Sequence, residues 1–394
     1  MRILIVSDVS SHMRGGVPTE TRSLIRGLGE RGHIVALASD APLEGAEEAQ
    51  HLPITVPAGP SISYEVGRAI NSFRPDFIHV ICMSSVGVAR LATLLRPHRW
   101  ALTVHSIPPH ERKLARWHDH ENVHYGLRAV RFLANSLAWR RVFRSGMVPQ
   151  IIVHSQYVED IVLTYGGREV MLIPLPFEAG SPTKADDRSD TEAPLLLSVG
   201  GLAHTKGQHD VLKAMPALLS QFPDLRYQAI GEIRDYSYLA YLHALARRLK
   251  VDAHVDITPD LPRAEKDDAL SRCSVYVQPS HEEGFCLAYA EAAAVVPRLV
   301  GTNTGAITAM SRGDEGARVV PVRQPKAIAA AVVELLGARL PAGHMAERAR
   351  RLSQSFALGG YLKAHETLYA RPPLPHRLAP ASLRASPSSQ FAEP

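Results

Sequence analysis

The sequence has 394 residues, of which 45% are hydrophobic and 21% charged, a globular composition that excludes disorder of the whole chain. Its net charge of +5 is too small and too diffuse for the dense basic surface of a nucleic-acid-binding protein, so we expect no nucleic-acid partner. The three cysteines, Cys82, Cys273 and Cys286, lie far apart, which indicates a reducing compartment and neither a disulfide framework nor a zinc site.

The first apolar run, residues 3–6, is shorter than the core of a signal peptide. No later run approaches the roughly 18 apolar residues that a membrane-spanning helix needs. We therefore expect a cytoplasmic protein, with any membrane contact peripheral and at the inner face of the cell membrane.

Short apolar runs rich in β-branched residues recur through residues 1–176, separated by stretches with helical periodicity. Continuously apolar strands are typical of a parallel sheet that is buried on both faces, and the alternation predicts right-handed βα units. The expected strands are residues 3–6, 34–37, 77–81, 100–104 and 151–153, with helices such as 20–31 and 84–95 between them.

Residues 177–193 contain almost no large apolar side chains and predict a linker. A second alternation of strands and helices follows in residues 194–354, with expected strands at 195–199, 227–230, 275–277 and 297–300 and helices at 208–220, 237–250 and 328–336. The sequence therefore predicts two doubly wound α/β domains, with ligands at the carboxyl ends of the strands in the cleft between them. Residues 371–394, rich in Pro, Ser and Ala, predict a disordered tail.

Gly15 and Gly16 follow the first expected strand and precede a helix. Paired glycines allow close approach of the backbone to a ligand, and the helix N-terminus favours an anion such as a diphosphate. The dinucleotide fingerprint G-x-G-x-x-G is absent from this loop, which argues against a nicotinamide enzyme.

The most informative segment is residues 279–294, which follow an expected strand and turn into a helix. Glu283 stands in the loop and Glu291 one to two turns into the helix, so one carboxylate is suited to an electron-poor sugar carbon and the other to ribose hydroxyls. The alternative is that Glu283 is a helix-start acid and Glu291 a solvated helix residue. The backbone amides expected to meet a phosphate are those of Gly284, Phe285, Cys286 and Leu287.

Glu283 and Glu291 resemble the E-x7-E motif of the retaining glycosyltransferases of family 4, which have the GT-B fold. Further motifs occur in that family's order, and the resemblance covers roughly residues 1–370. These motifs are Arg14-Gly15-Gly16, Arg31-Gly32-His33, residues 74–79, Thr103-Val104-His105, residues 151–155, the V-G-G-L-A-H-T-K-G segment at 199–207 and Ile230-Gly231.

The resemblance implies a GT-B fold, with two Rossmann-like domains that face an inter-domain cleft. Residues 1–176 then form the acceptor domain, residues 194–354 bind the nucleotide-sugar, and residues 355–370 form a helix that crosses back to the first domain. It also implies a retaining transferase that moves a sugar from a nucleotide-diphosphate-sugar to a hydroxyl acceptor, which we expect to be a polysaccharide or lipid-linked glycan.

The resemblance also assigns roles to individual residues. Lys206 neutralises the diphosphate leaving group, Glu291 holds the ribose, and Glu283 positions the donor sugar and stabilises an oxocarbenium-like transition state. His105 contacts the donor sugar or the acceptor, unless it is a buried histidine satisfied by the backbone. The remaining donor-binding residues are Gly15, Gly16, Gly201, Gly284, Phe285, Cys286 and Leu287. We expect no cofactor and no metal, because the sequence contains no D-x-D triplet.

Three positions depart from the family pattern. Gly201 stands where the family usually has Arg, so one cation of the diphosphate site is missing. Arg14 and Arg298 are the candidates to supply that cation instead. Cys286 replaces a usual Gly, and the family's A-x-G-x-P helix end is one residue shorter at 294–297. Two alternatives stay open on this basis: a GT-B nucleotide-sugar epimerase or hydrolase, and a non-catalytic scaffold that binds sugar nucleotides.

Residues 112–144 combine eight Lys or Arg with interleaved apolar side chains. Such a stretch suits either docking to anionic lipid headgroups or a surface helix that packs its apolar side on the first domain. Within it, the histidines and acids of 118–124 resemble a metal-ligand cluster, although a solvated polar helix is the favoured interpretation.

Overall fold

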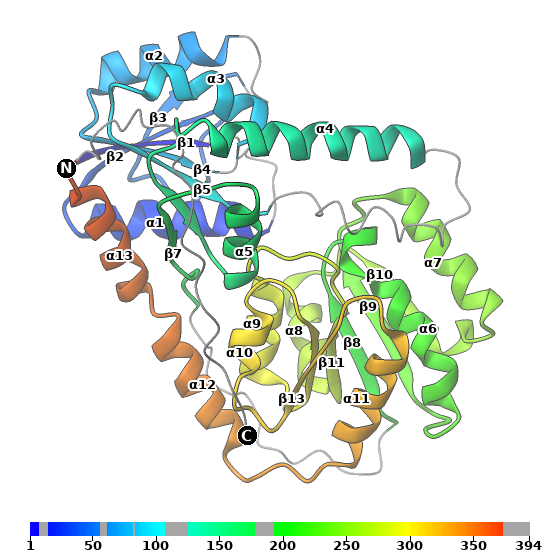
Figure 1. The fold of residues 1–394 in the computed structure, drawn as a ribbon. Coiled ribbons are helices and arrows are strands. Elements are labelled where there is room, and N and C mark those ends of the chain that lie inside the picture. The colour runs from blue at the N-terminus through cyan, green and yellow to red at the C-terminus, as the bar shows by residue number, and fades with distance from the viewer. Residues whose placement is uncertain (8–14, 56–60, 82, 107–124, 178–192, 373–394) are drawn as a thin grey trace, which may run out of the picture.

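The chain forms two α/β units, each built on one parallel sheet, stacked one above the other in Figure 1. The computed structural model describes residues 1–7, 15–55, 61–81, 83–106, 125–177 and 193–372. Most of the predicted linker and tail, residues 178–192 and 373–394, lies outside the described residues.

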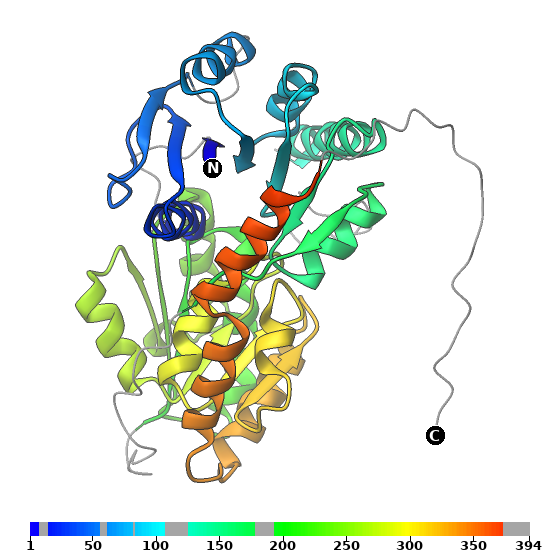
Figure 2. The same ribbon diagram turned by 90° about the vertical axis from the view of Figure 1, so that its left-hand side faces the viewer.

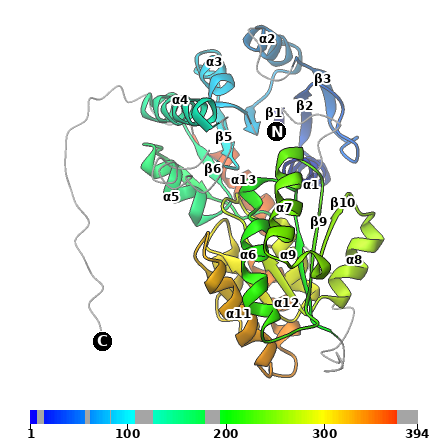
Figure 3. The same ribbon diagram turned by 90° about the vertical axis from the view of Figure 1, so that its right-hand side faces the viewer.

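The first unit has a seven-stranded parallel sheet in the order β3-β2-β1-β4-β5-β6-β7. The strands are β1 (Arg2–Ser7), β2 (Ile34–Ser39), β3 (Gln50–Pro53), β4 (Phe77–Ile81), β5 (Trp100–Val104), β6 (Ile151–Val153) and β7 (Val170–Leu172). The helices are α1 (Gly16–Glu30), α2 (Ile62–Phe73), α3 (Ser85–Leu95), α4 (Tyr125–Arg144) and α5 (Gln156–Thr164). In Figure 3, α4 and α5 lie on one flank of this unit and β2 and β3 on the other.

The second unit has a six-stranded parallel sheet in the order β10-β9-β8-β11-β12-β13. The strands are β8 (Leu195–Val199), β9 (Arg226–Gly231), β10 (Val255–Pro259), β11 (Val275–Gln278), β12 (Leu299–Thr302) and β13 (Ala317–Val320). The helices are η2 (His204–Lys206), α6 (Gln208–Leu219), α7 (Tyr236–Arg248), η3 (Asp252–His254), α8 (Arg263–Arg272), α9 (Leu287–Val295), α10 (Ile307–Ser311), α11 (Pro325–Gly337), α12 (His344–Ser355) and α13 (Leu358–Ala370).

The two doubly wound parallel sheets confirm the predicted α/β class. The central strands are buried along almost their whole length, as their continuous apolar runs predict. In each sheet the strand order reverses beside the first strand, between β1 and β4 and between β8 and β11. The loops that follow β8 and β11 therefore meet at the position where open α/β sheets bind ligands.

The last two helices join the two units. Figure 2 shows α12 and α13, coloured orange to red, running up one side of the molecule past both units. α12 contacts α9 in the second unit and α13 contacts α1 in the first. The backbone N–H of Phe177 donates to the Phe356 carbonyl at 2.8 Å, Arg31 pairs with Glu366 at 2.7 Å, and the Tyr369 hydroxyl lies 2.7 Å from Nδ1 of His79.

Helix α4 lies in the stretch 112–144, for which the sequence left open lipid docking or packing on the first domain. The second half of α4 packs on the first unit. Trp139, Val142 and Phe143 of α4 are buried in the core of the first unit. Leu133 and Leu137, one turn apart, are exposed on the same helix. Residues 112–124, including the predicted histidine cluster, lie outside the described residues. No described helix is both long and apolar enough to cross a membrane.

Candidate active site

Lys206 and Glu283 form an ion pair at the carboxyl end of the second sheet. Lys206 closes η2, just after β8, and Glu283 lies in the loop after β11. Their side chains meet with 2.8 Å between Nζ and Oε1. Two of the residues predicted to act on the same ligand are thus brought together from positions 77 residues apart in sequence.

Backbone contacts between residues 205–207 and residues 279–281 bring Lys206 and Glu283 together. Gly207, with a φ of 69°, caps α6, and a Cβ at this position would lie 2.1 Å from the carbonyl oxygen of Pro279. The N–H of His281 donates to the Thr205 carbonyl at 2.8 Å. Only a glycine allows the approach at 207, which explains the Lys-Gly sequence at 206–207.

The Glu283 carboxylate is buried and held by several donors. Its Oε1 accepts hydrogen bonds from the Ser280 hydroxyl at 2.7 Å and from Nε2 of Gln278 at 3.4 Å, in addition to Lys206. Burial disfavours the charged form of Lys206, but the adjacent Glu283 carboxylate outweighs this effect and raises the pKa of Lys206. Lys206 is therefore a fixed cation at neutral pH, held against the Glu283 carboxylate.

Helix α9 begins beside this pair. Its N-cap residue, Cys286, takes a left-handed backbone with a φ of 85°, a conformation that glycine adopts more readily and that explains the usual Gly at this position. Burial raises the pKa of the Cys286 thiol well above its ordinary value, so this cysteine stays neutral. The first amides of α9 point toward the start of the helix, as an anion site requires.

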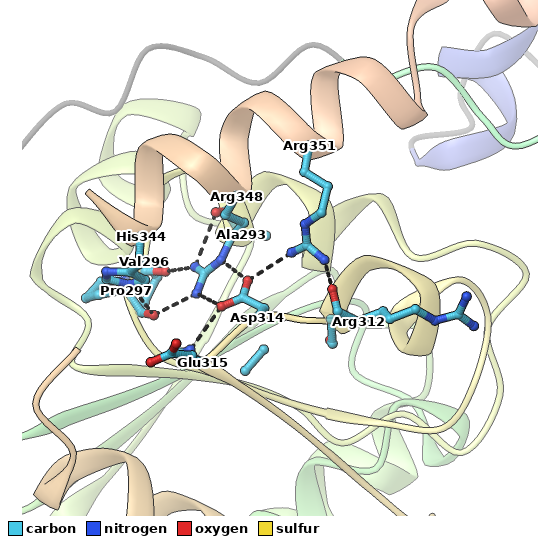
Figure 4. A network of polar contacts seen from close by, with 12 residues as sticks. Ala293, Val296, Pro297, Arg312, Asp314, Glu315, His344, Arg348 and Arg351 are labelled. Atoms are coloured by element: carbon cyan, nitrogen blue, oxygen red, sulfur yellow. Dashed lines mark hydrogen bonds and ion pairs between the residues drawn. The ribbon is translucent and has the colours of Figure 1, made fainter. Parts of the chain in front are cut away.

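The other end of α9 is held by a buried arginine from α12, shown in Figure 4. The Arg348 guanidinium donates to the carbonyls of Val296 at 2.6 Å and Pro297 at 2.9 Å, and its NH2 lies 2.9 Å from Oδ1 of Asp314. These bonds satisfy carbonyls at the shortened end of α9. The chain therefore stabilises this end with a side chain instead of the family's usual glycine turn.

The first unit closes over the site at His105. A Cβ at Gly284 would lie 2.2 Å from the carbonyl oxygen of His105, and the Ser155 hydroxyl donates to the Gly284 carbonyl at 2.5 Å. A Cβ at Gly16 would lie 3.6 Å from Leu287 at the start of α9. Residues from both units thus meet around Glu283.

His105 is anchored by a buried carboxylate that the sequence did not indicate. Glu20 of α1 contacts Nε2 of His105, Nε2 of His154 at 2.9 Å, and the Tyr361 hydroxyl, which donates at 3.1 Å. The expected alternative, a histidine satisfied by the backbone, is therefore wrong for the Nε2 of His105. Its Nδ1 is buried without a hydrogen-bond partner among the described residues.

Glu20, His105 and His154 form a largely buried cluster of titratable side chains. Burial would raise the pKa of Glu20, but the two histidines outweigh it and hold that pKa well below its ordinary value. Burial likewise disfavours a charged His154, yet Glu20 raises the pKa of His154. Glu20 therefore stays ionised behind the side chain of His105.

Two further predicted residues keep their side chains away from the buried Lys206–Glu283 pair. Glu291 is exposed on α9, where Oε2 lies 3.0 Å from Nζ of Lys266, and so it does not join the pair. Phe285 packs its ring on Phe356, with 5.4 Å between ring centroids, which leaves only its backbone to act in the site.

Arg298, one of the two candidates for the cation missing at Gly201, lies away from the site. Arg298 donates to the carbonyls of Leu335 at 2.8 Å and Ala338 at 3.3 Å, at the end of α11, so this prediction is wrong. Arg14 lies outside the described residues. Instead, Arg234 lies between Gly201 and Gly15. The only sequence signal for it is a basic residue three positions beyond the glycine that ends β9.

Two groups of described residues have the side chains to hold a metal: Glu20 with His105 and His154, and Asp210 with His209 and His281. In the second group, Oδ2 of Asp210 lies 2.7 Å from Nε2 of His281. Each group is thus joined by its own polar contacts, and we expect neither to need an ion.

Comparison with known proteins identifies the family. Residues 15–176 match the family described as "Glycosyl transferase 4-like domain", and residues 182–352 match "Glycosyl transferases group 1". A glycogen synthase of Mycobacterium tuberculosis is 33% identical over 196 residues, 48% of this chain and 46% of the relative. A phosphatidyl-myo-inositol mannosyltransferase of Mycolicibacterium smegmatis is 27% identical over 168 residues, 41% of this chain and 42% of the relative.

These matches span less than half the length of either curated relative. The solved structure of the Anabaena protein HepE in complex with UDP and glucose superposes with a TM-score of 0.71, at 17% identity, over 94% of this chain and all of the other. The family matches and the shared fold confirm the resemblance seen in the motifs. This chain belongs to the group 1 glycosyltransferases with the GT-B fold.

Proposed function

We propose that this protein is a retaining glycosyltransferase that moves a sugar from a nucleotide-diphosphate-sugar to a hydroxyl group of an acceptor. The observation that carries the proposal is the Lys206–Glu283 pair, fixed at the switch point of the second sheet beside the N-terminus of α9. The family membership supports the same donor class, and so does the UDP bound in the solved structure of HepE.

The pair suits the two charges that develop when a sugar leaves a diphosphate. Negative charge grows on the diphosphate oxygen, where the Lys206 ammonium and the first amides of α9 stabilise it. Positive charge grows on the anomeric carbon, where the Glu283 carboxylate stabilises it. We assign the ribose hydroxyls to Glu291, which is exposed on the same helix and would exchange its ion pair with Lys266 for them.

Retention requires that the acceptor oxygen bond to the face of the sugar that the diphosphate leaves. In the proposed step the bond from the anomeric carbon to the diphosphate oxygen breaks, and a bond from the same carbon to the acceptor oxygen forms on that face. The hydroxyl proton passes to the departing diphosphate. We assign contact with the donor sugar or the acceptor to His105, whose Nδ1 has no hydrogen-bond partner among the described residues.

The acceptor we propose is a glycan or a lipid-linked sugar. The two curated relatives are named for glycogen synthesis and for mannosyl transfer to phosphatidyl-myo-inositol, one acceptor of each kind. The exposed Leu133 and Leu137 of α4, with Arg141 and Arg144 exposed further along the helix, are the described residues suited to peripheral contact with anionic lipid. We expect no metal requirement, because the cations that face the leaving group are side chains.

The donor class is tested by calorimetric titration and thermal shift with UDP-, GDP- and ADP-sugars, with and without magnesium. We expect one nucleotide class to bind without magnesium, and Lys206→Ala to weaken that binding. Lys326→Ala, an exposed lysine on α11, is the matched control and should bind as the wild type does. Absence of binding to all three classes would contradict the proposal, whereas binding without transfer to any acceptor would favour the scaffold alternative.

The reaction is tested with the donor so identified. Glu283→Gln should keep the fold, judged by melting temperature, and lower turnover about a hundredfold, in the range found for other charge-stabilising residues. NMR of the product should show the donor's anomeric configuration. Inverted product would exclude the retaining mechanism, and donor consumption that needs no acceptor would favour the hydrolase or epimerase alternative.

A further inference from the structure

We propose that Arg234 supplies the cation that Gly201 leaves out, and that it binds the diphosphate of the donor together with Lys206. The inference rests on the proposed function, since it names a further binding residue of the same site. Arg234 lies 33 positions further along the chain than Gly201 and at the end of a different strand.

The backbone fixes Arg234 beside Gly201. β8 and β9 are parallel neighbours, and their pairing continues past both strands in an isolated bridge between Leu202 and Ile233. The N–H of Leu202 donates to the Glu232 carbonyl at 2.7 Å, and the N–H of Arg234 donates to the Leu202 carbonyl at 3.3 Å. The position of Arg234 therefore follows from the sheet and does not depend on a free loop.

The Arg234 side chain occupies the space that a side chain at 201 would take. A Cβ at Gly201 would lie 2.9 Å from both Cδ and Nε of Arg234, and 3.2 Å from its Cγ. A Cβ at Gly15, in the first unit, would lie 3.8 Å from the NH2 of Arg234. The guanidinium thus lies between the loops at Gly15 and Gly201, which the resemblance assigns to the donor-binding site.

The charges around Arg234 suit an anionic ligand. Arg234 is near enough to Lys206 to oppose its protonation, so two cations face the same space. Arg234 is half exposed and pairs with Glu232, at 3.2 Å between NH2 and Oε2. An ion pair with this exposure contributes little free energy, whereas a diphosphate offers the guanidinium fork several charged acceptors. Exchange of Glu232 for a diphosphate is therefore expected to be favourable for Arg234.

Titration of UDP, GDP and ADP against the wild type and three variants tests the inference. Arg234→Ala should raise the dissociation constant of whichever diphosphate binds the wild type by about tenfold or more. Arg247→Ala, an exposed arginine at the end of α7, is the matched control and should change it by less than about twofold. The melting temperature of each variant reports whether it is folded.

The third variant moves the arginine from position 234, after β9, to position 201, after β8. Gly201→Arg combined with Arg234→Gly should bind the diphosphate within about threefold of the wild type, because the guanidinium returns to the same space. Normal binding by the wild type with unchanged binding by Arg234→Ala would overturn the role of Arg234 and leave the proposed function standing. Failure of the wild type to bind any of the three would overturn both.

Discussion

At the residue scale, the buried carboxylate of Glu20 contacts His105 and holds its ring in position. Glu20 has no exposed side-chain surface, and it contacts His105, His154 and Tyr361. A buried carboxylate in this position stays charged only because histidine and hydroxyl partners surround it. We expect Glu20 to act as a positioning residue, which fixes the ring of His105 against the cleft.

The variant Glu20→Gln should lower the free energy of unfolding by about 3 kcal/mol near pH 5.5, because it leaves a buried His154 without its anion. The pKa of Glu20 is depressed, so its contribution is present above the ordinary pKa of about 4.3 and is lost as pH falls further. The pKa of His154 is raised, so its contribution is complete below about pH 6.5 and is lost as pH rises through the folded-state pKa.

The difference in the free energy of unfolding between the wild type and Glu20→Gln should therefore be largest between about pH 4.3 and 6.5 and should shrink toward pH 9. Urea denaturation at pH 5.5, 7 and 9 measures it. The matched control is Glu30→Gln on the same helix, where an exposed pair with Arg26 at 3.9 Å should contribute less than about 1 kcal/mol. A difference that stays constant from pH 5.5 to pH 9 would contradict the charged pair.

The residues that the sequence predicts well are those whose signal is local. Lys206 and Glu283 lie in short motifs that sit directly after strands, so their meeting at the switch point follows from a parallel sheet. Glu20 and Arg234 carry no such signal. The partners of Glu20 come from two other strands and the last helix, and Arg234 reaches Gly201 through a pairing beyond the strand ends. Such contacts are set by the tertiary fold and not by spacing along the chain.

At the element scale, the predicted strands are the interior ones and the missed strands are the edges. β3, β7, β10 and β13 are the outer strands of the two sheets, and the sequence pattern predicted none of them. β3 and β10 include His, Gln, Asp or Pro and lack the continuous apolar run of a doubly buried strand, and β7 has only three residues. Edge strands are only partly buried, so they lack the continuous apolar run that predicts the interior strands.

The anchoring of α9 by Arg348 can be tested as a property of the element. Arg348→Ala should lower the free energy of unfolding by about 3 kcal/mol, because it removes the buried cation beside Asp314, which then relies on its 3.2 Å pair with Arg351, and frees the carbonyls at the end of α9. Arg350→Ala, on the same helix with an exposed pair to Glu347, should change it by less than about 1 kcal/mol.

Urea denaturation measures the free energy of unfolding of Arg348→Ala and of Arg350→Ala. Adding Asp314→Asn to Arg348→Ala should recover part of the loss, since the buried charge is then removed as well. Equal stability of Arg348→Ala and Arg350→Ala would mean that α12 does not anchor α9. Because α9 carries the proposed phosphate amides at its other end, Arg348→Ala should also weaken nucleotide binding.

At the scale of the whole molecule, the two units are held together at two separate places. On one side, α12 and α13 carry the chain from the second unit back to the first, where Tyr361 reaches Glu20 and Tyr369 reaches His79. On the other, the backbone of Gly284 lies against that of His105 across the cleft. The helices join the units at one edge, and the contact at Gly284 limits how closely the loop that carries Glu283 approaches the first unit.

Gly284→Ala should therefore lower turnover about a hundredfold, because a Cβ 2.2 Å from the His105 carbonyl forces the two loops apart by about 1 Å or more. The second sheet and the Lys206–Glu283 pair do not depend on that contact, so unfolding should stay cooperative and nucleotide binding should fall much less than turnover. Gly337→Ala, where a Cβ would meet nothing within 4 Å, is the matched control. Full activity of Gly284→Ala, with the wild-type radius of gyration in solution scattering, would show that catalysis does not require the units to close at this contact.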